Sequence, residues 1–272
     1  MRIMSFNVRG AYWEEDGAND WPMRAALNVS TIQRSTPDVI GFQELQDGNL
    51  DVYQRELPHY HWSLGPHYGN QAPYEYPAIA WDPQKLRLVG VGGFWLSETP
   101  LIHSGSWATD CIRSAQWLRF QPYPGGATQI VLNTHLDHVS EAARVAGAQL
   151  IVRLLREVGA PGSDPAGVAM SAEPVIVMGD FNCDPGSAAY RVFLQAGFED
   201  SYLVSGGGLG HESFTYHGFQ GSNYRLKAGR SERIDWILVR GAPVQSAQII
   251  RDSMPPIYPS DHYPVMADVQ SC

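Results

Sequence analysis

Six strand-like segments of this 272-residue chain run into, or begin with, a polar side chain able to bind a cation or move a proton. The run Val175–Met178 is wholly apolar, yet it is followed by Gly179, Asp180 and, one residue further, Asn182. A carboxylate next to a buried strand is costly unless other groups or a cation offset its charge. The other five segments place Asn7, Glu44, His135, Asp235, and Asp261 with His262 in comparable positions.

The segments with strand character outnumber those with helical character. Strands are predicted at residues 2–8, 39–42, 77–81, 86–91, 115–120, 129–133, 174–178, 234–239 and 265–269. Helices are predicted at residues 20–35, at residues 141–158, where apolar residues recur every three or four positions, and between Pro185 and Gly197. These elements predict a single α/β domain over residues 1–272, with a large strand-built core and helices on its outer faces.

Composition narrows the choice of partners and compartment. The formal charge of −9 opposes wide electrostatic contact with duplex DNA, which requires many Lys and Arg side chains on one face. The three cysteines are far apart and lack a C-x-x-C spacing, so the sequence indicates neither a disulfide framework nor a cysteine zinc site. No signal peptide, membrane-spanning run or basic amphipathic helix is recognisable, and we expect a cytoplasmic protein that does not dock to a membrane.

The polar strand ends together predict a metal site. Several carboxylates brought close together repel one another unless a cation lies between them, and the same positions offer no matching Lys or Arg. Oxygen ligands without cysteine favour a hard ion, so we expect Mg²⁺, with Mn²⁺ as a possible substitute.

The ordered motifs resemble those of the endonuclease/exonuclease/phosphatase superfamily of metal-dependent phosphoesterases. They are SFNVRG, GFQE, NTHLDH, GDFN, RIDWILV and SDHYPV, and the resemblance extends from Met1 to about Val269. The stretches FWLSETP, THLDH and FTYHGF are similar to a deadenylase-like bacterial branch. The resemblance implies a four-layer α/β/β/α sandwich of two packed mixed β-sheets, with strand ends that form one cleft.

The resemblance also implies roles for the residues of the motifs. Asn7, Glu44 and Asp261 are the expected metal residues. Glu44 is expected to ligate Mg²⁺ directly with Asn7 beside it, and Asp261 to approach the same ion, since Mg²⁺ usually takes one or two carboxylates and keeps several waters. His262, paired with Asp235, is expected to contact the scissile phosphate or activate water.

Asp180 is an alternative base for the attacking water, and the sequence leaves open whether Asp180 or His262 takes the proton. Asn182 is expected to hydrogen-bond a phosphate oxygen.

Four further residues complete the predicted site. His135 is expected to donate a hydrogen bond to a phosphate oxygen or to the leaving group, and the resemblance places Glu75 where a carboxylate orients this histidine. Arg113 and His217 are expected as secondary phosphate contacts.

Two segments are candidates for the surface that selects the substrate. The first is basic and lies among aromatic residues: Arg225, Lys227, Arg230 and Arg233, near Phe214, Tyr216, Phe219 and Tyr224. Such a combination is typical of proteins that bind single-stranded nucleic acid. The second is the aromatic run from Tyr53 to Tyr76, which suits a small organic phosphate or a nucleotide.

The leading hypothesis is therefore a Mg²⁺-dependent phosphoesterase that acts on a small phosphodiester or phosphomonoester, a nucleotide or single-stranded nucleic acid. One alternative is a non-catalytic binding module on the same fold, which predicts the loss of a metal or imidazole position. Another is a glycosidase that uses paired carboxylates, which would need no Mg²⁺ and would give the Asp235 and His262 pair no function.

Overall fold

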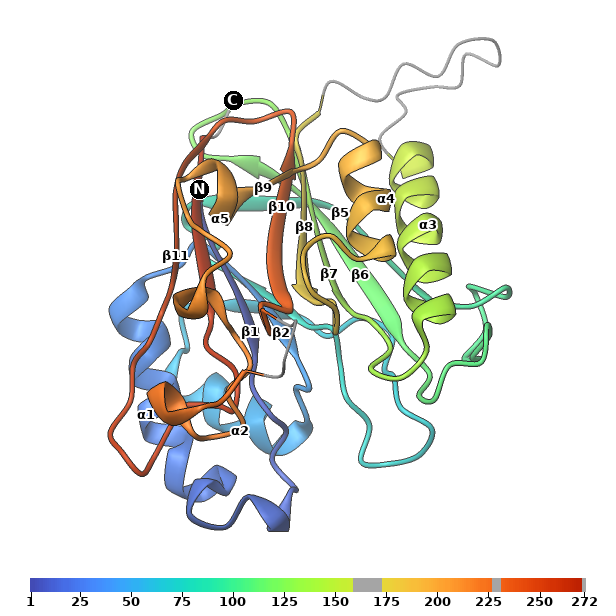
Figure 1. Cartoon of the computed structure of the whole chain (residues 1–272). Helices are drawn as coiled ribbons and strands as arrows, with labels where there is room; N and C mark the ends of the chain where they lie inside the picture. Colours follow the sequence, from blue (N-terminus) through green and yellow to red (C-terminus); the bar gives the residue numbers. More distant parts are fainter. Residues whose placement is uncertain (159–172, 227–230, 271–272) are drawn as a thin grey trace, which may run out of the picture.

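Two six-stranded mixed β-sheets form the centre of the computed structural model, which describes residues 1–158, 173–226 and 231–270 (Figure 1). The first sheet contains, in spatial order, β11 (Val244–Ile249), β12 (Val265–Val269), β1 (Arg2–Asn7), β2 (Val39–Gln43), β4 (Ile79–Trp81) and β3 (His61–Ser63). The second contains β5 (Leu86–Trp95), β6 (Ser114–Pro122), β7 (Gln129–His135), β8 (Val175–Asp180), β10 (Asp235–Arg240) and β9 (Glu199–Asp200). The pairs β1/β2 and β7/β8 are parallel, and the other neighbouring strands are antiparallel.

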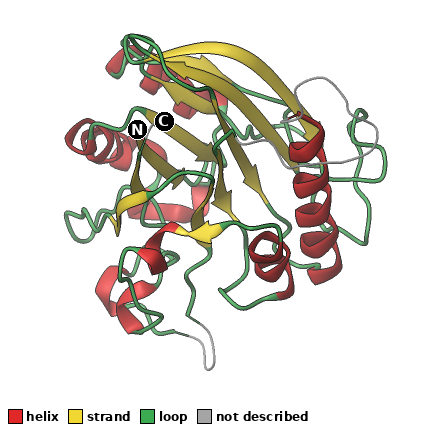
Figure 2. Ribbon diagram, turned by 90° about the horizontal axis from the view of Figure 1, so that it is seen from above, coloured by secondary structure: helices red, strands yellow, loops and turns green. Residues whose placement is uncertain are grey.

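Helices cover the outer faces of both sheets (Figures 1 and 2). The helices α1 (Trp21–Ser35) and α2 (Asp47–Glu56) lie against the first sheet, and α3 (Glu141–Val158) and α4 (Ala188–Gln195) lie against the second. The short helix α5 (Ser201–Val204) and 3₁₀ segments at Glu14–Asn19, His211–Ser213 and Gly221–Asn223 lie in the connections. This arrangement confirms the predicted α/β/β/α sandwich. No helix within the described ranges is both long and apolar enough to cross a membrane.

Two apolar layers, one on each face of β8, explain why the run before Asp180 has no polar residue. Ile176 and Met178 pack between the two sheets, whereas Val175 and Val177 pack on the other face of β8, under α3 and α4. A strand that is buried on both faces reads as a continuous apolar run rather than as an alternating one. The whole of β8, including Asp180, is buried.

The predicted elements agree with the observed ones, with a few differences. The helix predicted at residues 141–158 has those bounds, and the helix expected after Pro185 begins only at Ala188, because the Ser187 side chain caps it by accepting from the Tyr190 N–H. The helix α2 was not predicted, because its capping box uses Gln46 and Asn49 rather than the usual Ser or Thr. The strand β11 was not predicted either, because this edge strand has no buried residue and lacks a continuous apolar run.

We predict that Gly179→Ala destabilises the protein and displaces Asp180. Gly179 has φ +154°, and a Cβ built on it would lie 2.0 Å from the Thr134 carbonyl oxygen on the neighbouring strand β7. Because of overpacking and backbone strain, we expect the free energy of unfolding, measured with urea, to fall by at least about 3 kcal/mol. Gly186→Ala is the control: φ is +88° there, but no atom lies within 4 Å, so a loss of about 1–2 kcal/mol is expected. Equal losses in the two variants would contradict the steric argument.

Candidate active site

Three neighbouring strands of the second sheet place their polar ends side by side. His135 at the end of β7 pairs with Asp180 at the end of β8, and Asp180 pairs with Asp235 at the start of β10. Residues that pair in register point to the same face of a sheet, so these three side chains project together. In the first sheet, Asn7 and Gln43 pair at the ends of β1 and β2, and Glu44 follows directly.

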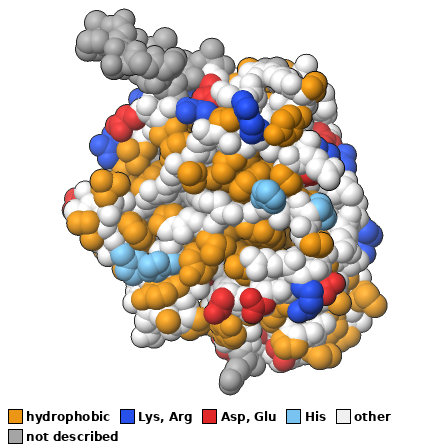
Figure 3. Space-filling view, turned by 180° about the vertical axis from the view of Figure 1, so that it is seen from behind, with side chains coloured by type: hydrophobic (Ala, Val, Ile, Leu, Met, Phe, Trp, Pro, Cys, Tyr) orange, Lys and Arg blue, Asp and Glu red, His pale blue; other side chains and the backbone are white. Residues whose placement is uncertain are grey.

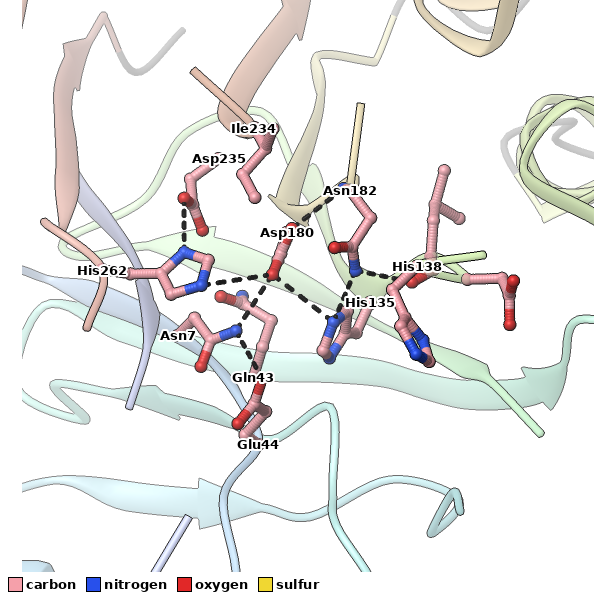
Figure 4. A network of polar contacts seen from close by, with 12 residues as sticks. Asn7, Gln43, Glu44, His135, His138, Asp180, Asn182, Ile234, Asp235 and His262 are labelled. Atoms are coloured by element: carbon pink, nitrogen blue, oxygen red, sulfur yellow. Dashed lines mark hydrogen bonds and ion pairs between the residues drawn. The ribbon is translucent and has the colours of Figure 1, made fainter. Parts of the chain in front are cut away.

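Asn7 joins the two sheets (Figure 4). Its Nδ2 donates to Glu44 Oε1 over 2.9 Å and to Asp180 Oδ2 over 3.0 Å, while its Oδ1 accepts from the Arg9 N–H over 3.0 Å. Asn7 was predicted to be one of the metal ligands. In the structure its amide oxygen is turned to the backbone, and its NH₂ group orients two carboxylates.

A second polar link between the sheets lies below Asn7. Gln43 Nε2 donates to Asn133 Oδ1 over 2.7 Å, and Asn133 Nδ2 donates to the carbonyls of Phe42 and Ala78 over 2.7 and 3.0 Å. Both side chains are fully buried. The sequence analysis missed them, although Asn133 lies two residues before His135 in an apolar strand and therefore faces the same side.

Glu44 has the properties of a ligand for a divalent cation. Its backbone has φ +57°, and its Oε2 is buried without a hydrogen-bond partner. Glu44, His135 and Asp180 offer ligand atoms within 4.8 Å of one another, as do Asp180, Asp235 and His262. Asp261 belongs to neither group, although it lines the same cleft. The unpartnered carboxylate oxygen and the oxygen-rich donor set therefore fit a divalent cation.

His262 and Asp235 form a buried ion pair. His262 Nδ1 lies 2.8 Å from Asp235 Oδ2, and its Nε2 lies 3.8 Å from Asp180 Oδ2. Burial alone would lower the pKa of His262, but the carboxylates of Asp235 and Asp261 outweigh it and hold the pKa well above 6.5. The contact is the pairing that the sequence analysis expected.

Asp180 lies at the centre of the cluster. Its Oδ2 is 3.4 Å from His135 Nε2, and its Oδ1 accepts from the Asn182 N–H over 2.9 Å. Burial and the neighbouring Asp235 carboxylate raise the pKa of Asp180. Burial and the nearby Arg113 guanidinium lower the pKa of His135 well below 6.5, so its neutral form is favoured too.

Arg113 and Tyr68, rather than Glu75, contact the far side of the His135 ring. Arg113 Nη1 lies 3.1 Å and Tyr68 Oη 3.2 Å from His135 Nδ1. Glu75 instead lies 3.9 Å from Arg113. The expectation that a carboxylate orients His135 directly is therefore wrong, because a cation and a phenol occupy that position.

His217, expected as a phosphate contact, is a core residue. Its side chain is fully buried, its Nδ1 accepts from the Gly221 N–H over 3.3 Å, and its ring packs 4.0 Å from that of Tyr263. Burial lowers the pKa of His217 to about 3, so the ring is neutral. His217 does not line the cleft that contains the other predicted residues.

The cleft above the cluster has a volume of about 730 Å³. Besides Glu44, Glu75, Arg113, His135, Asp180, Asn182, Asp261 and His262, its lining includes Arg9, Trp13, Cys111, His138, Glu141, Arg144, Cys183, Asp184, Ser187, Tyr216, Glu232 and Ile234. The lining of the cleft therefore carries acidic groups as well as basic ones.

The predicted basic and aromatic surface is largely absent from this cleft. Arg233 is buried and pairs with Asp200 over 2.5 Å, and Phe214 and Tyr224 pack against each other in the interior. Tyr216 lines the cleft, whereas Lys227 and Arg230 lie outside the described residues.

The aromatic run from Tyr53 to Tyr76 is not a cleft surface either. Tyr53, Tyr60 and Tyr68 are buried core residues, and of the run 53–76 only Glu75 lines the cleft.

The fold and the site define a class of hydrolase in which carboxylates, imidazoles and amides from the ends of two packed sheets meet in one cleft. The sequence pattern of the Endonuclease/Exonuclease/phosphatase family matches residues 4–262, and the chain belongs to this family. This confirms the resemblance drawn from the six motifs. Members of the family hydrolyse phosphoesters, and the chain is accordingly an enzyme that acts on phosphate ester bonds.

Several solved structures share the fold over almost the whole chain. A conserved protein of unknown function from Enterococcus faecalis is 28% identical, with 100% of both chains covered and a TM-score of 0.84. An endonuclease/exonuclease/phosphatase from Bacteroides vulgatus is 27% identical, with 99% of this chain and 98% of that chain covered and a TM-score of 0.84. A mannosyl-6-phosphatase from Bacteroides thetaiotaomicron is 26% identical, with 99% of both chains covered and a TM-score of 0.84.

We predict that Asp235→Asn lowers the pKa of His262, because the nearest carboxylate no longer favours the charged ring. Titration of the ring protons by NMR in the metal-free protein measures this shift. Asp184→Asn removes a carboxylate that lines the same cleft but does not contact His262, and it should leave the pKa unchanged. An unchanged His262 pKa in Asp235→Asn would contradict the pairing.

The difference in stability between the wild type and Asp235→Asn should depend on pH, because the two proteins differ in the pKa of His262. Because the pKa of His262 is raised in the folded protein, its charged ring stabilises the fold. This stabilisation is fully present below the pKa of His262 in the unfolded chain, about 6.5, and is lost as the pH rises through the pKa of His262 in the folded protein. We therefore expect the unfolding free energy of Asp235→Asn to fall furthest below that of the wild type in mildly acidic solution, as measured by urea unfolding at several pH values.

Proposed function

We propose that the protein is a Mg²⁺-dependent phosphoesterase that hydrolyses a phosphodiester or phosphomonoester by in-line attack of water. The observation that carries the proposal is the convergence of Asp180, the His262 and Asp235 pair, and Glu44, whose Oε2 has no hydrogen-bond partner, on one cleft. Phosphoryl transfer depends on positioning and on charge stabilisation, and this arrangement supplies both.

Glu44 is the residue we assign to the metal, with Asp180 close enough to share it. Asp261 remains a proposed ligand, and Asn7 is proposed to orient Glu44. Oxygen donors favour Mg²⁺, and Mn²⁺ prefers similar ligands. When bound, the ion would neutralise negative charge on the phosphate oxygens.

The chain's own residues handle the proton and the phosphate. Asp180 and His262 are the two groups we assign to the attacking water, since the Asp180 carboxylate and the His262 Nε2 face each other at 3.8 Å. Asp235 fixes the His262 ring through Nδ1. His135 and Asn182, which contact each other at the cleft, are assigned to phosphate oxygens or to the leaving group.

The charges of the cleft favour a small substrate with a single phosphate. The acidic residues Glu141, Asp184 and Glu232 line the cleft. Of the basic lining residues, Arg9 is paired with Asp16 over 3.0 Å, and Arg144 donates to the Asp137 carbonyl over 2.9 Å. A polyanion would meet like charges there, whereas an uncharged polar alcohol would meet hydrogen-bonding groups. A sugar phosphate fits this description, and the similarity to a mannosyl-6-phosphatase supports it.

Single-stranded nucleic acid is the second candidate substrate, and duplex DNA is not expected. A nucleic-acid groove needs positive charge along the backbone path. On the face shown in Figure 3, the Lys and Arg side chains of the described residues are scattered rather than gathered into a stripe. The cytoplasmic location, the single-domain organisation and the absence of membrane docking stay predictions from the sequence.

The two other hypotheses lack support from the site. A non-catalytic module would have lost a metal-binding or imidazole residue. Here the predicted residues Glu44, Asp180, Asp261, His135 and His262 line the cleft, and Asp235 adjoins it through His262. A carboxylate-pair glycosidase leaves the His262 and Asp235 pair without a function.

We predict that the protein hydrolyses p-nitrophenyl phosphate or bis-p-nitrophenyl phosphate with Mg²⁺ or Mn²⁺ and loses this activity in chelator. His262→Ala should lower kcat by about 10²–10⁴-fold, the range typical of a group that assists proton transfer. His103→Ala is the control, because His103 packs on His67 and does not line the cleft. Activity that survives chelator, or a His262→Ala variant with normal turnover, would overturn the mechanism.

We predict that Glu141→Lys improves hydrolysis of a short single-stranded oligonucleotide relative to a sugar 6-phosphate. The substitution replaces a negative with a positive charge at the cleft, so the KM for the oligonucleotide should fall several-fold at low salt and less at high salt. Glu157→Lys makes the same charge change near the other end of α3 and should alter neither KM. Equal effects of the two variants would show that cleft charge does not select the substrate.

A further inference from the structure

The guanidinium of Arg113 determines what the Nδ1 atom of His135 can do. Arg113 is buried, and its Nη1 lies 3.1 Å from His135 Nδ1. A guanidinium offers only N–H donors and cannot accept a hydrogen bond. His135 Nδ1 must therefore present its lone pair and cannot carry the ring proton.

Tyr68 adds a second donor on the same side. Its Oη accepts from the Glu44 N–H over 2.7 Å, which leaves its own proton for another partner, and Oη lies 3.2 Å from His135 Nδ1. The Tyr68 ring stands edge-on to the imidazole at 5.7 Å and lies 5.4 Å from the Arg113 guanidinium carbon. Tyr68 thereby connects the backbone of Glu44 with the ring of His135.

Glu75 supports this arrangement from behind. Its carboxyl group lies 3.9 Å from Arg113, and burial and the neighbouring Glu44 raise its pKa to about 8. A carboxyl group that keeps its proton can donate to the Tyr68 hydroxyl, which leaves the Tyr68 proton for His135 Nδ1. Glu75 therefore acts on His135 through Arg113 and Tyr68.

The other nitrogen of His135 faces the cleft. His135 Nε2 lies 2.9 Å from Asn182 Nδ2 and 3.4 Å from Asp180 Oδ2. An ionised carboxylate only accepts, so Asp180 Oδ2 can take a hydrogen bond from a proton on Nε2. Asn182 Nδ2 also donates to the Leu136 carbonyl over 3.0 Å, so the amide oxygen can turn to Nε2 only at the cost of that one bond. Arg113 has no acceptor at all for a proton on Nδ1.

We propose that Arg113 and Tyr68 are positioning residues that hold His135 as the Nε2–H tautomer, so that its imidazole donates a hydrogen bond into the cleft. A carboxylate on Nδ1 would instead select the opposite tautomer and make Nε2 an acceptor. That a substrate oxygen accepts this hydrogen bond rests on the proposed function. The assignment of the Nε2–H tautomer rests only on the contacts of His135.

The test is NMR of the metal-free full-length protein with ¹⁵N-labelled histidine at neutral pH. Long-range ¹H–¹⁵N spectra distinguish a protonated ring nitrogen from a bare one, and His135→Gln identifies the signals of His135. In the wild type we expect a bare Nδ1 and a protonated Nε2. A wild-type spectrum with the proton on Nδ1 would overturn the proposal, whatever the variants do.

Two variants test the two donors separately. Arg113→Met should move a measurable fraction of His135 to the Nδ1–H tautomer, and Tyr68→Phe should move less, because Arg113 remains. Arg113→Lys, which keeps a donor and the charge, should restore much of the Nε2–H form. An Arg113→Met spectrum identical to that of the wild type would remove Arg113 from this role.

Kinetics separate this inference from the proposed function. Arg113→Met should lower kcat about 10-fold or more while KM changes less, because a donor aimed at the reacting group acts mainly in the transition state. Failure of the wild type to hydrolyse any phosphate ester, with Nε2 protonated, would refute the proposed function alone. Active enzyme with Nδ1 protonated would refute the tautomer alone.

Discussion

The hydrogen bonds of Asn7 are the interaction on which the site depends. Its NH₂ group connects Glu44 in the first sheet with Asp180 in the second, over 2.9 and 3.0 Å. The buried Gln43 and Asn133 side chains hold the same two sheets together one layer below. A buried carboxylate is tolerated only where donors or a cation surround it, so the carboxylates lie where the two sheets meet. The scaffold and the reactive cluster are therefore stabilised by the same contacts.

Neighbouring charges give the two imidazoles of the cluster different properties. His135 and His262 are both buried, and burial disfavours the charged form of each. Carboxylates around His262 outweigh burial and raise its pKa, whereas the guanidinium beside His135 adds to burial and lowers its pKa. One imidazole is thus set up as a cation and the other as a neutral donor, within hydrogen-bonding or ion-pair distance of the same Asp180.

The sequence was sufficient for the strands that carry the polar residues of the site and for those residues themselves, because each motif is local. An apolar run followed by a polar residue reveals both the strand and the side chain at its end, as in the segment that leads to Asp180. Contacts between distant segments were not predictable. The sequence did not show that Arg113 would take the place expected for Glu75, that His217 would pack on Tyr263, or that Arg233 would be buried against Asp200. Each of these depends on loops whose paths follow from tertiary packing rather than from a local pattern.

Anomalous diffraction from crystals soaked in Mn²⁺ tests most directly whether the polar strand ends form one metal site. We expect an anomalous peak in the cleft beside the Glu44 carboxylate, close to Asp180, and its loss in crystals of Glu44→Gln. A wild-type crystal with Mn²⁺ bound elsewhere and no peak beside Glu44, or a peak that persists unchanged in Glu44→Gln, would contradict the assignment of this cluster to the metal.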